Sequence, residues 1–99
     1  MKMYWAKMFT SKSNVLIAIC DEDVLDKELG PKKFKVKVSK NFYGERLVDA
    51  EIALRLMKNA TIGNLFGKNI VQLAEENGFI TKENVILIGG VPHAQFVRL

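Results

Sequence analysis

Two pairs of apolar, β-prone segments, one pair at each end of the chain, constrain the fold more than any other feature of the sequence. Residues 3–9 and 14–20 are separated by turn residues within TSKSN, and residues 83–88 and 94–99 are joined by GGVPH. β-branched and aromatic residues on both sides of a short turn indicate a β-hairpin. The sequence therefore predicts one hairpin at each end of the chain.

The segment KFKVKV, residues 33–38, has the clearest strand pattern. Side chains alternate between the two faces of a strand, so Phe34, Val36 and Val38 share one face and the intervening lysines share the other. The pattern predicts a strand with one packed face and one solvated face.

Helical patterns occur at three places. The acidic residues 21–29 predict one short helical turn that ends at Gly30-Pro31. Asp49 is expected to cap a helix that runs to about Asn59. KNIVQLAEEN predicts the other main helix, with Gly78 as its left-handed cap.

Residues 60–67 fit either a strand or a helix. Gly63 and Gly67 would each cost about 1 kcal/mol in a helix interior, which favours a short strand ending at Gly67. The resulting order of elements predicts an α+β fold, with a mostly antiparallel sheet and two main helices on one face. A chain of 99 residues without repeats or linkers is expected to form a single domain over residues 1–99.

Composition narrows the class of protein. The chain is 48% hydrophobic, as expected for a globular protein. Its net charge of +4 permits an anionic partner without requiring one. No apolar run approaches the roughly 18 residues that cross a bilayer, and the N-terminus does not resemble a signal peptide, so we expect a cytoplasmic protein with no membrane partner. Cys20, the only cysteine, excludes an internal disulfide and a cysteine-rich zinc site, and no metal or cofactor is predicted.

Four stretches resemble the archaeal family known as domain of unknown function 424. They are CDEDVLDKEL, NFYGERLVD, ATIGNLFGKNIVQLAEENGFI and ENVILIGGVPHAQFVRL, of which IGGVPHAQ is the most specific. The resemblance covers essentially the whole chain. It implies a small cytoplasmic archaeal protein with no established activity. The family's association with the archaeal information-processing machinery implies a link to RNA or translation.

A lysine stripe is the first candidate for function. Lys33, Lys35 and Lys37 are spaced along one strand face at about 6.6 Å per step, close to the spacing of phosphates in a nucleic acid, and Lys40 extends the line. Aromatic residues could add stacking surfaces if they lie on the same side. These are Tyr4, Trp5, Phe42 and Tyr43. The alternative is a solvated face whose lysines protect an edge strand from aggregation.

A glycine-rich segment is the second candidate. Gly67 and Lys68 lie at a probable helix start, where free N–H groups and a cation could bind an anion, and Asn64 lies just before them. The segment matches neither a P-loop nor a dinucleotide-binding motif, so a glycine required only for a tight turn is the simpler interpretation.

The C-terminal stretch GGVPHAQFVRL holds the only histidine and is the third candidate. Gly89 and Gly90 permit a tight turn, and Pro92 restricts the backbone beside it. His93 and Gln95 then share one strand face and could form a general base or an RNA contact. The alternative is a structural hairpin in which both side chains satisfy buried backbone groups. Possible partners of His93 are Asp21, Glu22, Tyr43 and Asn64.

We therefore predict a binding protein for RNA, the ribosome or a translation factor, with phosphate contacts from the lysine stripe and specific contacts from His93 and Gln95. The first alternative is a small enzyme or ligand-binding protein with a cleft around His93. The second is a structural partner in a homo-oligomer, formed through an edge strand. We expect the protein to be a monomer or a small homo-oligomer.

Overall fold

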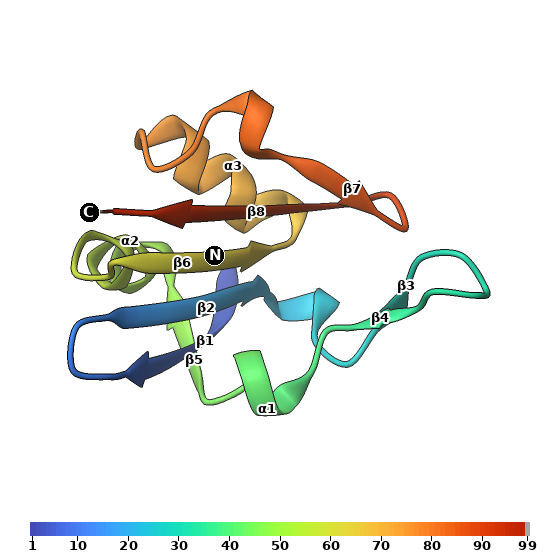
Figure 1. The fold of residues 1–99 in the computed structure, drawn as a ribbon, viewed down its shortest axis with the longest axis horizontal. Coiled ribbons are helices and arrows are strands. Elements are labelled where there is room, and N and C mark those ends of the chain that lie inside the picture. The colour runs from blue at the N-terminus through green and yellow to red at the C-terminus, as the bar shows by residue number, and fades with distance from the viewer. Residues whose placement is uncertain (99) are drawn as a thin grey trace.

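The computed structural model describes residues 1–98, which form a six-stranded sheet with the order β5-β1-β2-β6-β8-β7 (Figure 1). All neighbouring strands are antiparallel except β2 and β6, which are parallel. The strands are β1 (Met3–Thr10), β2 (Val15–Asp21), β5 (Arg46–Asp49), β6 (Ile62–Phe66), β7 (Ile86–Ile88) and β8 (Val91–Val97). A separate two-stranded sheet pairs β3 (Glu28–Leu29) with β4 (Val36–Lys37).

Helices α2 (Ala50–Lys58) and α3 (Lys68–Glu76) pack on one face of the six-stranded sheet, behind the strands in Figure 1. The short helix α1 (Lys40–Tyr43) packs on the opposite face, which we call the open face. Two 3₁₀ turns, η1 (Glu22–Val24) and η2 (Lys82–Asn84), complete the elements. The predicted α+β class, with a mostly antiparallel sheet and two main helices on one face, is confirmed.

Each central strand contributes to two cores because its side chains alternate between the faces. On the helix side, Ile19 and Leu65 are buried with Met57 and Ile70. On the open face, the shorter helix α1 covers a second buried cluster. Its members are Ala18, Cys20, Val24, Val38, Tyr43 and Phe66.

Both predicted hairpins are present. β7 and β8 are joined by Gly89 and Gly90 alone, with φ angles of 57° and 81°. Two consecutive positive φ angles are typical of the type I′ turn, whose twist matches a hairpin. Because this turn needs only two residues, Pro92 and His93 belong to β8 and not to the loop that the sequence suggested.

The predicted start of α2, the strand before Gly67 and the end of α3 are confirmed. The Asp49 carboxylate accepts a hydrogen bond of 3.0 Å from the Ile52 N–H at the start of α2. Residues 62–66 form a strand, and Gly78 follows the end of α3. The acidic segment forms one short helical turn, as expected, but this turn covers only Glu22–Val24 and does not extend to Gly30-Pro31, because Glu28 and Leu29 form the strand β3 and pair with β4.

The prediction for residues 33–38 is wrong in its packing. Only Val36 and Lys37 form a strand, which pairs with the equally short β3 in an arm that projects from the body (Figure 1). The Phe34 side chain is 76% exposed, whereas Val38, where the arm returns to the body, is fully buried. The alternating pattern identified extended backbone, but no core lies beneath the arm to bury Phe34.

Candidate functional site

A row of aromatic rings crosses the open face from β1 to β8. Phe9 stacks on Phe42 with centroids 5.4 Å apart, and Phe42 meets Tyr43 edge to face at 5.0 Å. The row continues through Phe66 at 6.3 Å to His93 at 4.9 Å. Edge-to-face and offset-stacked rings at these distances attract one another, so the row helps to hold His93 in place.

Three polar side chains lie at the β8 end of this row, and we call Asn64, His93 and Gln95 the polar row. Asn64 is directly opposite Gln95 in the register of β6 and β8, and all three residues lie on the open face. The Asn64 Oδ1 accepts a hydrogen bond from the Tyr43 hydroxyl and lies 3.1 Å from the His93 Nε2. Tyr43 and Asn64 are two of the predicted partners of His93, and the structure joins all three.

The environment of this network favours neutral side chains. Burial lowers the pKa of His93 below its ordinary value of 6.5, because desolvation disfavours the imidazolium. Burial likewise raises the pKa of the Tyr43 hydroxyl, so this group remains a donor at neutral pH. The partner of His93 is an amide and not a carboxylate, and therefore it provides no negative charge to stabilise a protonated imidazole.

An open depression of about 430 Å³ adjoins the polar row. It is lined by Glu83, Asn84, Ile86, His93 and Gln95. The Ile86 side chain is 57% exposed beside His93, its register partner on β8. The depression thus combines an apolar wall with the free edge of the polar row.

Gly67 and Lys68 do not join this group. The carboxylate of Asp21 lies at the start of α3 and accepts hydrogen bonds of 2.8 Å from the N–H groups of Asn69 and Ile70. Lys68 lines a different hollow, together with Pro92. A carboxylate of the chain itself therefore occupies the position that the sequence suggested for a bound anion.

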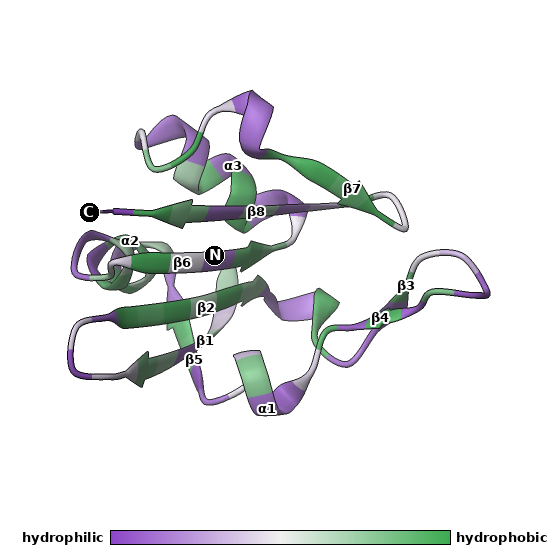
Figure 2. Cartoon of the chain, viewed as in Figure 1, coloured by the Kyte–Doolittle hydropathy of each residue, from purple (hydrophilic) through white to green (hydrophobic). Residues whose placement is uncertain are grey.

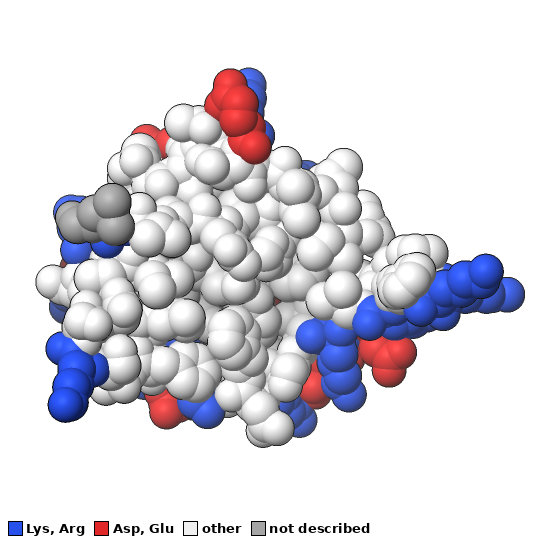
Figure 3. Space-filling view, viewed as in Figure 1, with Lys and Arg blue, Asp and Glu red and all other residues white. Residues whose placement is uncertain are grey.

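The predicted lysine contacts lie on the arm. Lys33, Lys35 and Lys37 are all exposed, and so is Lys32 beside them. Figure 3 shows the basic arm projecting from the edge of an open face whose centre carries no charged side chain. Lys40 differs, because it starts α1 and pairs with Asp26 at 3.2 Å.

Two turns place the arm beside the C-terminal hairpin. A Cβ atom on Gly89 would lie 2.6 Å from the backbone nitrogen of Gly30, so the backbones of these two segments are in contact. Gly89 is therefore required both for its positive φ and for this close approach.

Of the aromatic residues considered for stacking, Phe42 and Tyr43 share the open face with Trp5, whereas Tyr4 is buried on the helix side.

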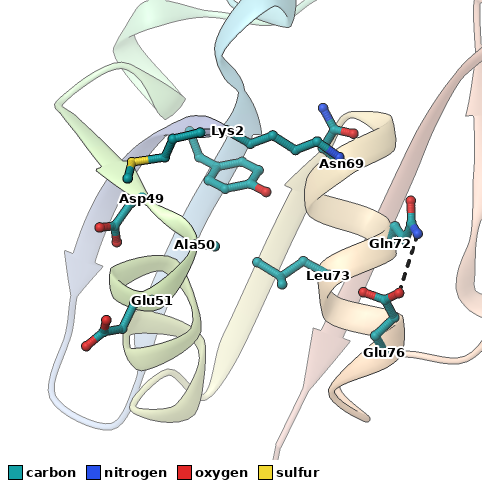
Figure 4. A pocket seen from close by; sticks show the side chains of 10 residues that line it. Lys2, Asp49, Ala50, Glu51, Asn69, Gln72, Leu73 and Glu76 are labelled. Atoms are coloured by element: carbon teal, nitrogen blue, oxygen red, sulfur yellow. Dashed lines mark hydrogen bonds between the residues drawn. The ribbon is translucent and has the colours of Figure 1, made fainter.

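Another hollow, of about 460 Å³, lies between the starts of α2 and α3 (Figure 4). Lys2 lies at its rim together with Asp49, Glu51 and Glu76, and Glu51 points away from the gap. Three carboxylates against one lysine make this rim unfavourable for phosphate groups. Tyr4 lines this hollow, and none of the other residues predicted for a site does.

Burial on the open face raises the pKa of the Cys20 thiol to about 12, and the nearby Asp21 adds to the shift. A thiol that stays protonated is a poor nucleophile and a poor metal ligand.

Residues 1–98 contain no cluster of three or more side chains suited to a metal ion. Within the same residues, no helix is long and apolar enough to span a membrane. Figure 2 shows β2 and β7 as hydrophobic strands.

Comparison with known proteins identifies a family but no activity. The fold is similar to that in the crystal structure of an uncharacterized conserved protein from Methanopyrus kandleri, with a TM-score of 0.79 and 21% sequence identity. The match covers 98% of this chain and 94% of the other. No curated protein matches the chain. The model of the family described as "Protein of unknown function (DUF424)" matches residues 9–99, and the chain therefore belongs to this family.

Proposed function

We propose that this protein binds single-stranded RNA, with phosphates along the arm and bases across the open face. The observation that carries the proposal is the position of the arm, whose exposed lysines lie at the edge of a sheet face that contains aromatic rings and is uncharged at its centre (Figure 3). Positive side chains that follow a backbone beside surfaces for stacking are the usual means of binding single strands.

Charge supports the arm as the phosphate-binding element. Lys32, Lys33, Lys35 and Lys37 are exposed within one segment, and residues 31–40 contain no acid. None of these four lysines forms an ion pair within residues 1–98, unlike Lys40. Their charge is therefore available to a polyanion.

The open face supports base contacts for a different reason. Phe9 and Phe42 are half-buried, so part of each ring remains accessible at the β1 end of the aromatic row. The polar row at the other end offers hydrogen-bonding groups without charge. Phe34, on the arm itself, adds a ring that is 76% exposed. Bases can stack on such rings irrespective of sequence.

The test is a fluorescence anisotropy titration of a labelled single-stranded RNA between about 50 and 200 mM salt. Binding should weaken steeply with salt, and the double variant Lys33→Glu/Lys35→Glu should lose at least about tenfold in affinity. The control is Lys12→Glu/Lys58→Glu, which changes the net charge equally at two exposed positions away from the arm.

Equal losses in both double variants would mean that only net charge matters, and unchanged binding in both would refute the proposal. If the RNA belongs to the translation apparatus, as the family resemblance implies, whole ribosomes should compete with the labelled strand. Sedimentation of the protein alone separates this function from the homo-oligomeric alternative.

The second candidate function is a small enzyme or ligand-binding protein centred on His93. The observation that favours it is the open depression beside a histidine held in one orientation by Asn64. A general base is usually oriented by a carboxylate that stabilises its protonated form, and His93 has an amide in that position. This difference ranks the catalytic alternative below RNA binding.

A further inference from the structure

The hydrogen bonds of Asn64 determine which atoms of the polar row remain free. An amide oxygen can only accept, so the Tyr43 hydroxyl and the His93 Nε2 both donate to Asn64 Oδ1. His93 is therefore in its Nε2–H tautomer, and its Nδ1 carries a lone pair. Neither this Nδ1 nor the Asn64 Nδ2 has a partner within residues 1–98.

These free atoms are accessible to a ligand. Among residues 1–98, no fully buried side-chain nitrogen or oxygen lacks a hydrogen-bond partner. The unpartnered Nδ1 of His93 and Nδ2 of Asn64 must therefore reach the surface. Gln95, exposed and directly opposite Asn64, adds an amide whose oxygen and nitrogen are also free.

We infer that the polar row reads the edge of one unpaired base that carries an amino group beside a ring-nitrogen acceptor, as adenine and cytosine do. This inference rests on the proposed binding of RNA. The Gln95 oxygen would accept from the amino group while its nitrogen donates to the ring nitrogen, the bidentate geometry by which amides recognise adenine.

The remaining atoms strengthen the discrimination. His93 Nδ1 is an acceptor, so it can take the second hydrogen of the amino group. Uracil presents a carbonyl oxygen where adenine and cytosine carry the amino group, and this oxygen would face the Nδ1 of His93, an acceptor whose orientation is fixed by the hydrogen bond to Asn64. The exposed Ile86 side chain provides an apolar surface next to the base.

The first arm of the test compares oligoadenylate, oligocytidylate and oligouridylate of equal length by anisotropy at one salt concentration. The wild-type protein should bind the adenine or the cytosine strand about tenfold more tightly than the uracil strand. Gln95→Leu should remove most of this preference, because the base edge then loses the amide that positions it against His93 Nδ1. The control Gln72→Leu removes an exposed amide from α3, on the far side of the sheet, and should keep the preference.

The second arm uses adenosine, cytidine and uridine, which have no phosphate and so do not depend on the arm. The side-chain NH₂ resonances of Asn64 and Gln95 should shift with adenosine or cytidine and not with uridine.

Equal affinity for the three strands, with lysine-dependent binding, would overturn the base-reading inference and leave the proposed function standing. If the wild-type protein binds none of the three strands, the proposed function is overturned, and the experiment with nucleosides then tests base reading separately. Unchanged resonances with all three nucleosides, or a Gln72→Leu effect equal to that of Gln95→Leu, would also overturn the inference.

Discussion

Asp21 and Gly67 are fitted to each other at the start of α3. A Cβ atom on Gly67 would lie 2.4 Å from the carboxyl carbon of Asp21, and the Gly67 φ angle is 131°. The absent side chain leaves room for the Asp21 carboxylate to accept from the N–H groups of Asn69 and Ile70. The end of β2 is thereby joined to the start of α3 across 48 residues of sequence.

Gly67→Ala should lower the free energy of unfolding by about 3 kcal/mol, because alanine adds both the clash and an unfavourable φ. Asp21→Ala should cost about 2 kcal/mol by removing the cap of α3. Chemical denaturation of both variants and their double mutant measures the effects. A double mutant that shows the full sum of both losses would contradict the coupling.

The same aspartate should make stability depend on pH. Burial raises the pKa of the Asp21 carboxyl above 3.8, although the two backbone N–H groups oppose the shift. The stabilisation that comes from protonating this buried carboxyl, as distinct from its capping hydrogen bonds, is therefore fully present below the unfolded pKa and is lost as pH rises through the folded pKa. Denaturation midpoints of wild type and Asp21→Asn should converge at low pH more closely than at pH 7. A difference independent of pH would contradict this expectation.

His93 should titrate below its ordinary range. Its folded-state pKa is lowered by burial, so its contribution to stability is present above 6.5 and is lost as pH falls through the folded value. The protein has a single histidine, and one imidazole C–H signal in a proton NMR titration reports it directly. A midpoint at or above 6.5 would contradict the burial of the ring. His93→Gln should remove the corresponding loss of stability in acid.

The Cys20 thiol should be unreactive in the native protein. Its pKa of about 12 leaves almost no thiolate at neutral pH, and the residue is fully buried. Reaction with an aromatic disulfide reagent should be slow under native conditions and rapid in denaturant. Rapid modification without denaturant would show that the core beneath α1 opens readily.

Phe34 and Val38 should respond oppositely to substitution, although both occupy hydrophobic positions of the same alternating segment. Phe34→Ser should leave the free energy of unfolding within about 0.5 kcal/mol of wild type, since the ring is already exposed. Val38→Ala should cost about 2 kcal/mol by opening a cavity in the core of the open face. Comparable losses would indicate that the arm packs against the body in solution.

Features that depend on neighbouring residues follow from the sequence alone. The tight turn permitted by Gly89 and Gly90, the Asp49 cap and the helix end at Gly78 all follow from backbone preferences or hydrogen bonds within a few residues. The shared face of His93 and Gln95 likewise follows from the period of a strand.

Contacts between distant groups, by contrast, depend on long-range packing. Alternation in residues 33–38 cannot show whether a core lies beneath the strand, and Phe34 proves to be exposed. The capping of α3 by Asp21 and the hydrogen bond between Asn64 and His93 depend on pairing across β2, β6 and β8. The sequence supplied the residues of the polar row, but their order in the sheet is set by long-range packing, which local preferences do not encode.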